Sequence, residues 1–269
     1  MPGVRDLQTM AGAEPITMLT AYDATTAALV DDADVEVILV GDSMGRETLG
    51  FDSTLPVTVD DMARHVGAVA RSTEDALVVA DMPFLSIGVD RAQSVEHCGR
   101  MIKEEGANAV KLESGPHTVE LTEHLTDLGI PVMAHLGLTP QSHNLTDRVR
   151  QATTREAARE QLDLAKRHAE AGAFSLVLEH VPANVAAQIT DAIDIPTIGI
   201  GAGPDCDGQV LVVNDVLGLT ESPPPFSASF GDVRSAMTDA ISAYRAAVKD
   251  GEYPAAEHTH ADSTLDDIA

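Results

Sequence analysis

Short apolar runs, each followed at once by a polar or ionisable residue, recur along the chain. The clearest is residues 37–40, an apolar and largely β-branched run that is typical of a buried parallel strand and stops at Gly41, Asp42 and Ser43. Four later runs end in the same way, at Asp81, Glu113, His135 and Glu179. Parallel strands of α/β proteins present their carboxyl ends at one edge, where ligands bind. The pattern therefore predicts one site assembled from successive strand ends.

Strands alternate with helices through most of the chain. The expected strands are residues 16–22, 37–40, 77–81, 109–113, 131–135, 175–179, 195–199 and 209–213. Apolar residues at helical spacing, together with cap and stop residues, predict helices at residues 23–32, 59–72, 91–105, 117–128, 154–171, 182–193 and 230–249. Eight strands in this alternation predict a closed (β/α)8 TIM barrel, with a doubly wound open sheet as the alternative.

The length of 269 residues suits a single barrel domain. We expect residues 1–251 to form that domain. Residues 252–269 are acidic, contain histidine and have few apolar side chains, and this composition predicts a disordered C-terminal tail.

Acidic residues greatly outnumber basic ones. The chain has 43 Asp and Glu against 17 Lys and Arg, a formal net charge of −26. The acids are spread along the chain, which favours a solvated surface adapted to a cytosol of very high salt, as in halophile proteins. An acidic partner-binding surface is the alternative. Nucleic acid binding is excluded as a function class, because the chain has no basic patch to neutralise phosphates.

The cellular compartment is indicated by two features that the sequence lacks, a membrane-spanning or leader segment and a disulfide framework. The sequence has no apolar run of membrane-spanning length and no basic-then-apolar leader, so we expect a soluble, unexported protein that does not associate with membranes. Its two cysteines make neither a disulfide framework nor a Cys-x-x-Cys motif. Both observations predict a cytoplasmic protein.

Three carboxylates follow neighbouring strands of the predicted barrel, at Asp42, Asp81 and Glu113. Carboxylates that converge without basic residues repel one another unless a cation holds them together. Hard oxygen ligands that leave room for water or substrate suit Mg²⁺. In the alternative interpretation, each carboxylate caps the helix that follows it.

Three further side chains in this region allow two interpretations each. Lys111 lies within an apolar strand and needs a partner, either an ion pair with Glu113 or a substrate carboxylate or enolate, and these two are compatible. Glu179 is placed to act as a general base, or else caps the next helix. His135 either contacts substrate or is a core histidine.

Residues 199–203 are glycine-rich, which indicates a phosphate-binding loop or a tight connection.

Several motifs of the chain resemble the ketopantoate hydroxymethyltransferase family. They lie at residues 18–23, 40–43, 52–58, 79–84, 109–113, 135–141 and 198–203, with weaker echoes at 253–254 and 257–258. The resemblance spans nearly the whole chain in order. It implies a (β/α)8 barrel of the phosphoenolpyruvate/pyruvate-like superfamily and a homo-oligomer, commonly a decamer.

The resemblance also implies a reaction. A hydroxymethyl group passes from 5,10-methylenetetrahydrofolate to α-ketoisovalerate (3-methyl-2-oxobutanoate) through a magnesium-stabilised enolate, giving ketopantoate for pantothenate and coenzyme A biosynthesis. Asp42 and Asp81 would bind Mg²⁺ directly and so meet the substrate, with Glu113 bound through water. Ser43 and Lys111 would meet the substrate carboxylate, His135 would line the pocket, and Glu179 would be the base. The tetrahydrofolate derivative is a cosubstrate, and Mg²⁺ is the cofactor.

One segment departs from the family pattern. Residues 142–148 read Ser-His-Asn-Leu-Thr-Asp-Arg, where the family usually continues with Gly-Gly-Tyr and a basic residue. A loop that follows a barrel strand shapes the mouth of the site, so the contacts to folate are expected to differ here. Two alternatives stay open: a related barrel lyase or mutase acting on another 2-oxo acid, and a non-catalytic paralogue that binds a 2-oxo acid.

Overall fold

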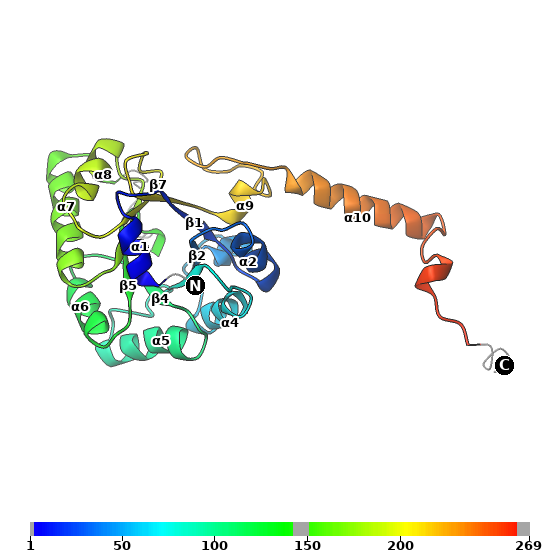
Figure 1. The fold of residues 1–269 in the computed structure, drawn as a ribbon, viewed down its shortest axis with the longest axis horizontal. Coiled ribbons are helices and arrows are strands. Elements are labelled where there is room, and N and C mark those ends of the chain that lie inside the picture. Colours follow the sequence, from blue (N-terminus) through cyan, green and yellow to red (C-terminus); the bar gives the residue numbers. More distant parts are fainter. Residues whose placement is uncertain (1–2, 142–150, 263–269) are drawn as a thin grey trace. The chain divides into compact units, whose positions relative to one another are not determined.

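The centre of the protein is a closed ring of eight parallel strands (Figure 1). The computed structural model describes residues 3–141 and 151–262. Each strand pairs with the next along the chain, and the last pairs with the first. The strands are β1 (Ile16–Thr20), β2 (Val37–Val40), β3 (Leu77–Asp81), β4 (Ala109–Glu113), β5 (Val132–Gly137), β6 (Ser175–Glu179), β7 (Thr197–Ile200) and β8 (Gly208–Leu211). The barrel prediction is confirmed, and the open-sheet alternative is wrong.

Helices alternate with the strands along the chain, and further helices follow the last strand. The longer ones are α2 (Ala24–Asp31), α4 (Val59–Ala70), α5 (Arg91–Lys103), α6 (Val119–Asp127), α7 (Arg155–Glu170), α8 (Ala183–Thr190) and α10 (Val233–Lys249). The shorter ones are α1 (Val4–Met10), α3 (Met44–Glu47), α9 (Val213–Val216) and the 3-10 helix η2 (Ala256–His258). The longer helices match the predicted ones to within a few residues at each end. Helices of one or two turns show no apolar period, so the short ones were not predicted.

Local sequence explains where the helices begin and end. The residue before each of four helices accepts a hydrogen bond from the backbone N–H three positions later, at Asp23, Thr58, Asp90 and Thr154. Past the ends of α5 and α6, the chain turns through Gly106 and Gly129 at φ of 88° and 85°, a backbone conformation that favours glycine. These signals fix where each of these helices begins or ends.

Side chains alternate between the inside and the outside of the ring, because successive residues of a strand face opposite ways. The inside holds one apolar cluster, with Val37, Leu39, Leu77, Val79, Ala109, Met133, Val177 and Ile198 among its members. Leu7 of α1 belongs to the same cluster and is fully buried. The outward residues of β5 and β6 pack instead with α7 and α8, in a second cluster that includes Leu136, Leu178, Leu164 and Ile189.

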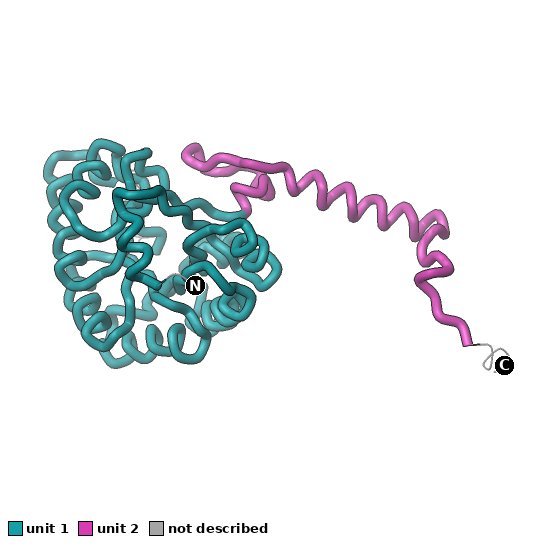
Figure 2. The backbone as a smooth tube through the Cα atoms, in the orientation of Figure 1, with its two compact units in different colours: residues 1–213 teal, residues 214–269 magenta. Residues whose placement is uncertain are grey.

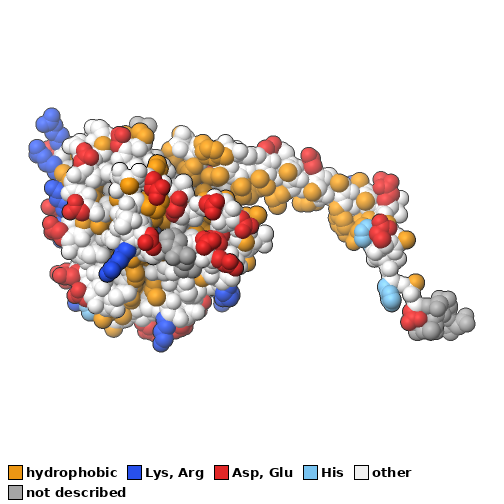
Figure 3. All heavy atoms as spheres, in the orientation of Figure 1, with side chains coloured by type: hydrophobic (Ala, Val, Ile, Leu, Met, Phe, Trp, Pro, Cys, Tyr) orange, Lys and Arg blue, Asp and Glu red, His pale blue; other side chains and the backbone are white. Residues whose placement is uncertain are grey.

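The chain forms two compact units, residues 1–213 and residues 214–269 (Figure 2). The first contains the barrel. In the second, α10 has no buried residue and carries an exposed apolar stripe of Met237, Ile241, Tyr244 and Val248 (Figure 3). The predicted division, with one domain to residue 251 and a disordered tail beyond it, stays a prediction. Of that tail, residues 263–269 lie outside the described part of the chain.

Within the two described ranges, no helix combines the length and the apolar character needed to cross a membrane.

Candidate active site

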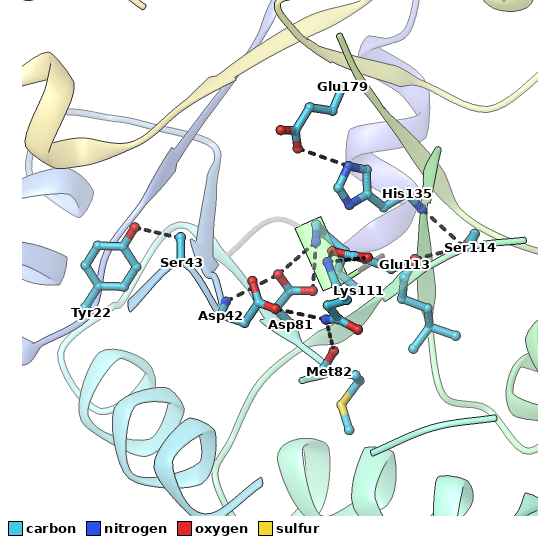
Figure 4. Close-up of polar contacts among 12 residues, drawn as sticks. Tyr22, Asp42, Ser43, Asp81, Met82, Lys111, Glu113, Ser114, His135 and Glu179 are labelled. Atoms are coloured by element: carbon cyan, nitrogen blue, oxygen red, sulfur yellow. Dashed lines mark hydrogen bonds and ion pairs between the residues drawn. The ribbon is translucent and has the colours of Figure 1, made fainter. Parts of the chain in front are cut away.

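A polar layer lies above the apolar interior of the barrel, at the carboxyl ends of its strands. Asp81, Lys111, Glu113, His135 and Glu179 follow the inward residues Val79, Ala109, Met133 and Val177 at even spacing, so they face the same side. Asp42 and Ser43 come just after β2. Figure 4 shows these side chains gathered from β2 to β6 around one space. The predicted site residues are therefore brought together, as the strand-end pattern indicated.

Lys111 makes the central ion pair of this layer. Its Nζ donates to both carboxylate oxygens of Asp81, at 2.7 and 2.8 Å, and both side chains are buried. The expectation that the ion-pair partner is Glu113 is wrong. In the parallel register, Asp81 lies directly opposite Lys111 on the neighbouring strand, whereas Glu113 is two residues further along the same strand. The cross-strand neighbour is the closer one.

Gln141 is a site residue that the strand pattern did not reveal. Its backbone N–H donates to both carboxylate oxygens of Glu113 at 3.1 Å. Its side-chain Nε2 donates to Asp42 Oδ2 and to the Met82 carbonyl, each at 2.9 Å. Gln141 thus joins the ends of β2, β3 and β4. It lies in the loop after β5, where no periodicity marks a functional position, although it closes the His-Leu-Gly-Leu-Thr-Pro-Gln motif.

Burial sets the protonation preferences of this cluster. It raises the pKa of Glu113 to about 9, and burial together with the charge of Asp81 raises the pKa of Asp42 well above its ordinary value. Burial alone would lower the pKa of Lys111, but the charges of Asp81, Asp42 and Glu113 outweigh it and the pKa is raised. Three carboxyl groups therefore surround one ammonium group, and a further cation among them would favour their ionised forms.

Asp42 and Asp81 offer a donor set that suits a hard divalent cation. Mg²⁺ prefers carboxylate oxygens and commonly takes only one or two of them from the protein, with water or substrate as its other ligands. Among residues 3–141 and 151–262, no three His, Cys, Asp or Glu side chains are close enough to hold a metal ion alone. An ion bound by Asp42 and Asp81 would complete its coordination with water or substrate oxygens.

His135 and Glu179 form a second group on the opposite side of the site. His135 Nε2 lies 3.2 Å from Glu179 Oε2, with the imidazole almost fully buried and the carboxylate partly exposed. Burial and the nearby charge of Lys111 lower the pKa of His135, so its ring is neutral near pH 7. Glu179 does not cap α8, because Pro182 is the cap and no side chain bonds there. The helix-cap alternative for Glu179 is wrong.

Gly137 lets the ends of β5 and β6 come close together. It lies opposite Glu179 in the register, with φ of 96°, and a Cβ at this position would be 2.1 Å from the Glu179 carbonyl oxygen. That oxygen accepts a hydrogen bond of 2.8 Å from the Leu138 N–H. Any larger residue would push Glu179 away from His135.

Ser43 is held from the β1 side of the ring. Its Oγ lies 2.9 Å from the Tyr22 hydroxyl, and the Tyr22 ring is almost fully buried. The Tyr22 carbonyl in turn contacts His65 Nδ1. Burial raises the pKa of Tyr22, so the phenol keeps its proton. Tyr22 is another neighbour of the site that the strand-end pattern did not indicate.

The two loops discussed at the sequence level differ in what the structure describes. Residues 142–148 lie outside the described part of the chain. In the glycine-rich loop after β7, a Cβ on Gly203 would be 2.4 Å from the Cβ of Ala183. This packing favours the interpretation of residues 199–203 as a tight connection.

Solved structures with a similar fold define the class of barrel. Phosphoenolpyruvate phosphomutase from Streptomyces platensis subsp. rosaceus has a TM-score of 0.60 at 16% identity, covering 98% of this chain and 93% of that one. 2,3-Dimethylmalate lyase, a PEP mutase/isocitrate lyase superfamily member, has a TM-score of 0.59 at 15% identity, covering 93% and 89%. Phosphonopyruvate hydrolase, solved in complex with oxalate and Mg++, has a TM-score of 0.61 at 12% identity, covering 96% and 93%. All three structures share the barrel fold of this chain.

Sequence comparison identifies the family. Residues 3–256 match the profile of ketopantoate hydroxymethyltransferase. The chain is 68% identical over 268 residues to the 3-methyl-2-oxobutanoate hydroxymethyltransferase of Haloarcula marismortui, covering 100% of both chains. It is 64% identical to that of Natronomonas pharaonis, covering 98% of both, and 48% identical to that of Geobacter metallireducens, covering 94% and 96%. The chain belongs to the ketopantoate hydroxymethyltransferase family.

Proposed function

We propose that this chain transfers a hydroxymethyl group from 5,10-methylenetetrahydrofolate to α-ketoisovalerate, giving ketopantoate. The observation that carries the proposal is the paired layout of the site. The Asp42, Asp81 and Lys111 group faces the His135 and Glu179 group across one space, in a chain that matches the family profile over residues 3–256. One group suits a 2-oxo acid and its cation, and the other suits proton removal.

We infer that Asp42 and Asp81 would hold Mg²⁺, with Glu113 reaching it through water. Their buried carboxylate oxygens support this assignment, and so does the Mg++ in the solved phosphonopyruvate hydrolase of similar fold. When bound, the ion supplies Lewis acidity to the 2-oxo acid. Gln141 keeps the Asp42 carboxylate in place through its Nε2. The ion pair with Lys111 does the same for Asp81.

The remaining side chains orient the 2-oxo acid. Lys111 contributes a buried positive charge for the carboxylate of the substrate, and the Ser43 hydroxyl is available for a hydrogen bond to it. If Tyr22 donates its proton to Ser43 Oγ, the Ser43 hydroxyl keeps its own hydrogen for another acceptor. The neutral His135 ring lines the space between the substrate and Glu179.

Glu179 acts as the general base in this proposal. Its carboxylate takes the C3 proton of α-ketoisovalerate, and the neutral His135 at 3.2 Å orients that carboxylate. The methylene carbon of the folate is bonded to both N5 and N10. It forms one new bond to C3 and one to the oxygen of a water molecule, while both of its bonds to nitrogen break. The C3 proton and one proton of the water go to the two nitrogens, so the products are ketopantoate and tetrahydrofolate.

The experiment that tests this function is proton NMR of α-ketoisovalerate in D2O, with the protein, Mg²⁺ and high KCl, with and without methylenetetrahydrofolate. The expected result is loss of the C3 proton signal in both samples, with ketopantoate formed only in the sample that contains folate. No exchange in either sample, with the protein folded and loaded with metal, would refute the proposal and favour a ketoacid-binding paralogue. Exchange with cleavage of another 2-oxo acid would favour a lyase.

We also infer a cytoplasmic homo-oligomer, with a decamer as the expected size. Two free cysteines, Cys98 and Cys206, support a reducing compartment. The size is checked by light scattering in high salt, and a monomer would refute it.

A further inference from the structure

A cavity lies outside the site described above, between the first turns of α7 and α8. Its volume is about 580 Å³, which is within the range of pockets that take small ligands. Ala158, Leu162 and Val185 form its apolar part, and Asn184 and Gln188 of α8 contribute amide groups. α8 begins four residues after β6 ends, so the α8 part of the cavity lies at the same end of the barrel as the site.

Two arginines line this cavity, Arg155 and Arg159, one turn apart on α7. Both are exposed, and within the described ranges neither guanidinium has a hydrogen bond or an ion pair. Arg155 is also the first residue of α7, where the helix dipole disfavours a cation, which favours a role other than helix stability. Two guanidinium groups on one wall are notable in a chain with 43 acidic and 17 basic residues.

Residues of the cavity lie close in the chain to the strand that carries Glu179. Pro182, which lines the cavity, is three residues after Glu179. Gln151, next to the cavity residue Ala152, donates its backbone N–H to the His180 carbonyl at 3.1 Å. The cavity therefore lies on the β6 side of the barrel, the side that carries Glu179.

We propose that this cavity binds the carboxylate-bearing glutamyl end of the folate cosubstrate, through Arg155 and Arg159. The inference rests on the proposed function, which requires the one-carbon end of the folate to lie beside Glu179. The aminobenzoyl ring then lies against the apolar wall, and the glutamyl carboxylates meet the two guanidinium groups. Arginine suits this ligand because its planar group binds carboxylates through two parallel hydrogen bonds.

High salt makes direct contact necessary for such a ligand. At 1 M ionic strength, charges act over only about 3 Å, so an acidic surface does not repel a polyanion and distant basic residues do not attract it. Only guanidinium groups that touch the carboxylates contribute to affinity. A cavity that holds two of them beside an apolar wall meets this requirement.

The test uses the full-length protein with Mg²⁺ in high KCl. The double variant Arg155→Ala/Arg159→Ala is compared with Lys166→Ala/Arg167→Ala, which removes the same charge from exposed positions of α7 that do not line the cavity. We expect the cavity variant to raise the KM for methylenetetrahydrofolate about tenfold or more, and the control variant to leave it unchanged. Exchange of the α-ketoisovalerate C3 proton without folate stays at the level of the unmodified protein in both.

A second substrate shows whether a rise in KM comes from loss of the contact to the glutamyl carboxylates or from a general change in the structure of the site. Methylenetetrahydropteroate lacks the glutamyl carboxylates, so the cavity variant and the unmodified protein should have the same KM for it. An equal rise for both substrates would overturn the inference, as would an unchanged KM for the folate. If the unmodified protein shows no C3 exchange, the proposed function itself fails. Normal exchange with no effect of the arginines refutes the cavity assignment alone.

Discussion

At the scale of single residues, the site is stabilised by contacts between strands that are far apart in sequence. Gln141 bonds Asp42, the Met82 carbonyl and Glu113, and so holds three strand ends at fixed separations. A carboxylate that must receive a proton or a cation works best when its orientation is set before substrate arrives. Gln141 and Tyr22 do this for side chains on the β1 to β4 side, and Gly137 does it for Glu179.

Replacement of Glu179 by Gln should separate substrate binding from proton removal. Gln has the same shape but no basic carboxylate, so we expect α-ketoisovalerate to bind with little change. Exchange of its C3 proton should fall by about 10² to 10⁴, the usual contribution of a general base. NMR exchange in D2O measures the rate, with Glu156→Gln on α7 as the control variant. Exchange at the unmodified rate in Glu179→Gln would refute the assignment of the base.

Replacement of Tyr22 by Phe should weaken the binding of the 2-oxo acid. The change removes the hydroxyl that lies 2.9 Å from Ser43 Oγ and keeps the buried ring, so the fold is retained. A neutral hydrogen bond contributes about 1 kcal/mol, which corresponds to a roughly fivefold rise in KM for the 2-oxo acid with kcat nearly unchanged. Tyr244→Phe on α10 serves as the control. A fall in kcat with an unchanged KM would assign Tyr22 a different role.

Most of the site residues could be predicted because each follows an apolar strand. Asp42, Asp81, Glu113 and Glu179 end runs whose burial the sequence makes plain. Gln141 and Tyr22 could not be predicted in this way, because Gln141 lies in a loop and Tyr22 is an uncharged residue that the pattern places inside the first strand. The partner of Lys111 depends on the register between β3 and β4, which no single strand reveals.

At the scale of elements, the fold was predictable from repeated local signals. Caps at residues such as Thr58 and Thr154 and turns at glycines mark the helices, and the short apolar runs mark the strands. Some strand ends were predicted less accurately than others. β7 begins two residues later than predicted, because Ile195 and Pro196 are apolar but precede the first residue that pairs with β6. The contacts between neighbouring helices were not predictable, since they depend on which side chains of two different helices face each other in the folded chain.

One such contact is between α6 and α7, where His168 is fully buried. Its Nδ1 lies 3.0 Å from the Thr122 hydroxyl. Burial lowers the pKa of His168 from 6.5 to about 4, and the charges of Arg167 and His117 act in the same direction. Above pH 6.5 the ring is neutral in both the folded and the unfolded chain. Between pH 6.5 and about 4 only the unfolded chain takes up the proton, so stability falls as the pH falls.

Replacement of His168 by Gln should flatten this part of the stability profile. The shift corresponds to about 3 kcal/mol across the whole window, of which about 2 kcal/mol should be lost between pH 7 and pH 5. Urea unfolding at the two pH values measures the difference for the unmodified protein and the variant. The exposed His260→Gln serves as the control. An equal pH dependence in His168→Gln and the unmodified protein would contradict the burial argument.

At the scale of the whole molecule, the net charge of −26 dominates the surface. Acidic side chains are scattered over the visible face rather than gathered in one patch (Figure 3). Relatives from the halophilic archaea Haloarcula, Natronomonas and Halobacterium share 64–68% identity with the chain. Like charges at this density destabilise the compact state unless salt screens them.

Dilution of KCl should therefore destabilise the protein. We expect the melting temperature to fall steadily as KCl is lowered from the molar range to about 0.1 M, because the screening length grows from about 3 Å to about 10 Å. Differential scanning calorimetry measures the change. Glycine betaine at equal osmolality is the control, since a zwitterion does not screen charge. A melting temperature that is independent of KCl, or equally restored by betaine, would refute adaptation to salt.

The pairing of β8 with β1 has a consequence for synthesis of the chain. β1 is made early, yet one of its two neighbours ends at Leu211. Until that residue is added, the growing sheet has unpaired edges, which are templates for aggregation. At about 5–20 residues per second, that interval lasts roughly 10 to 40 s. The arrival of β8 both closes the ring and ends the exposure of the nascent chain to other strands.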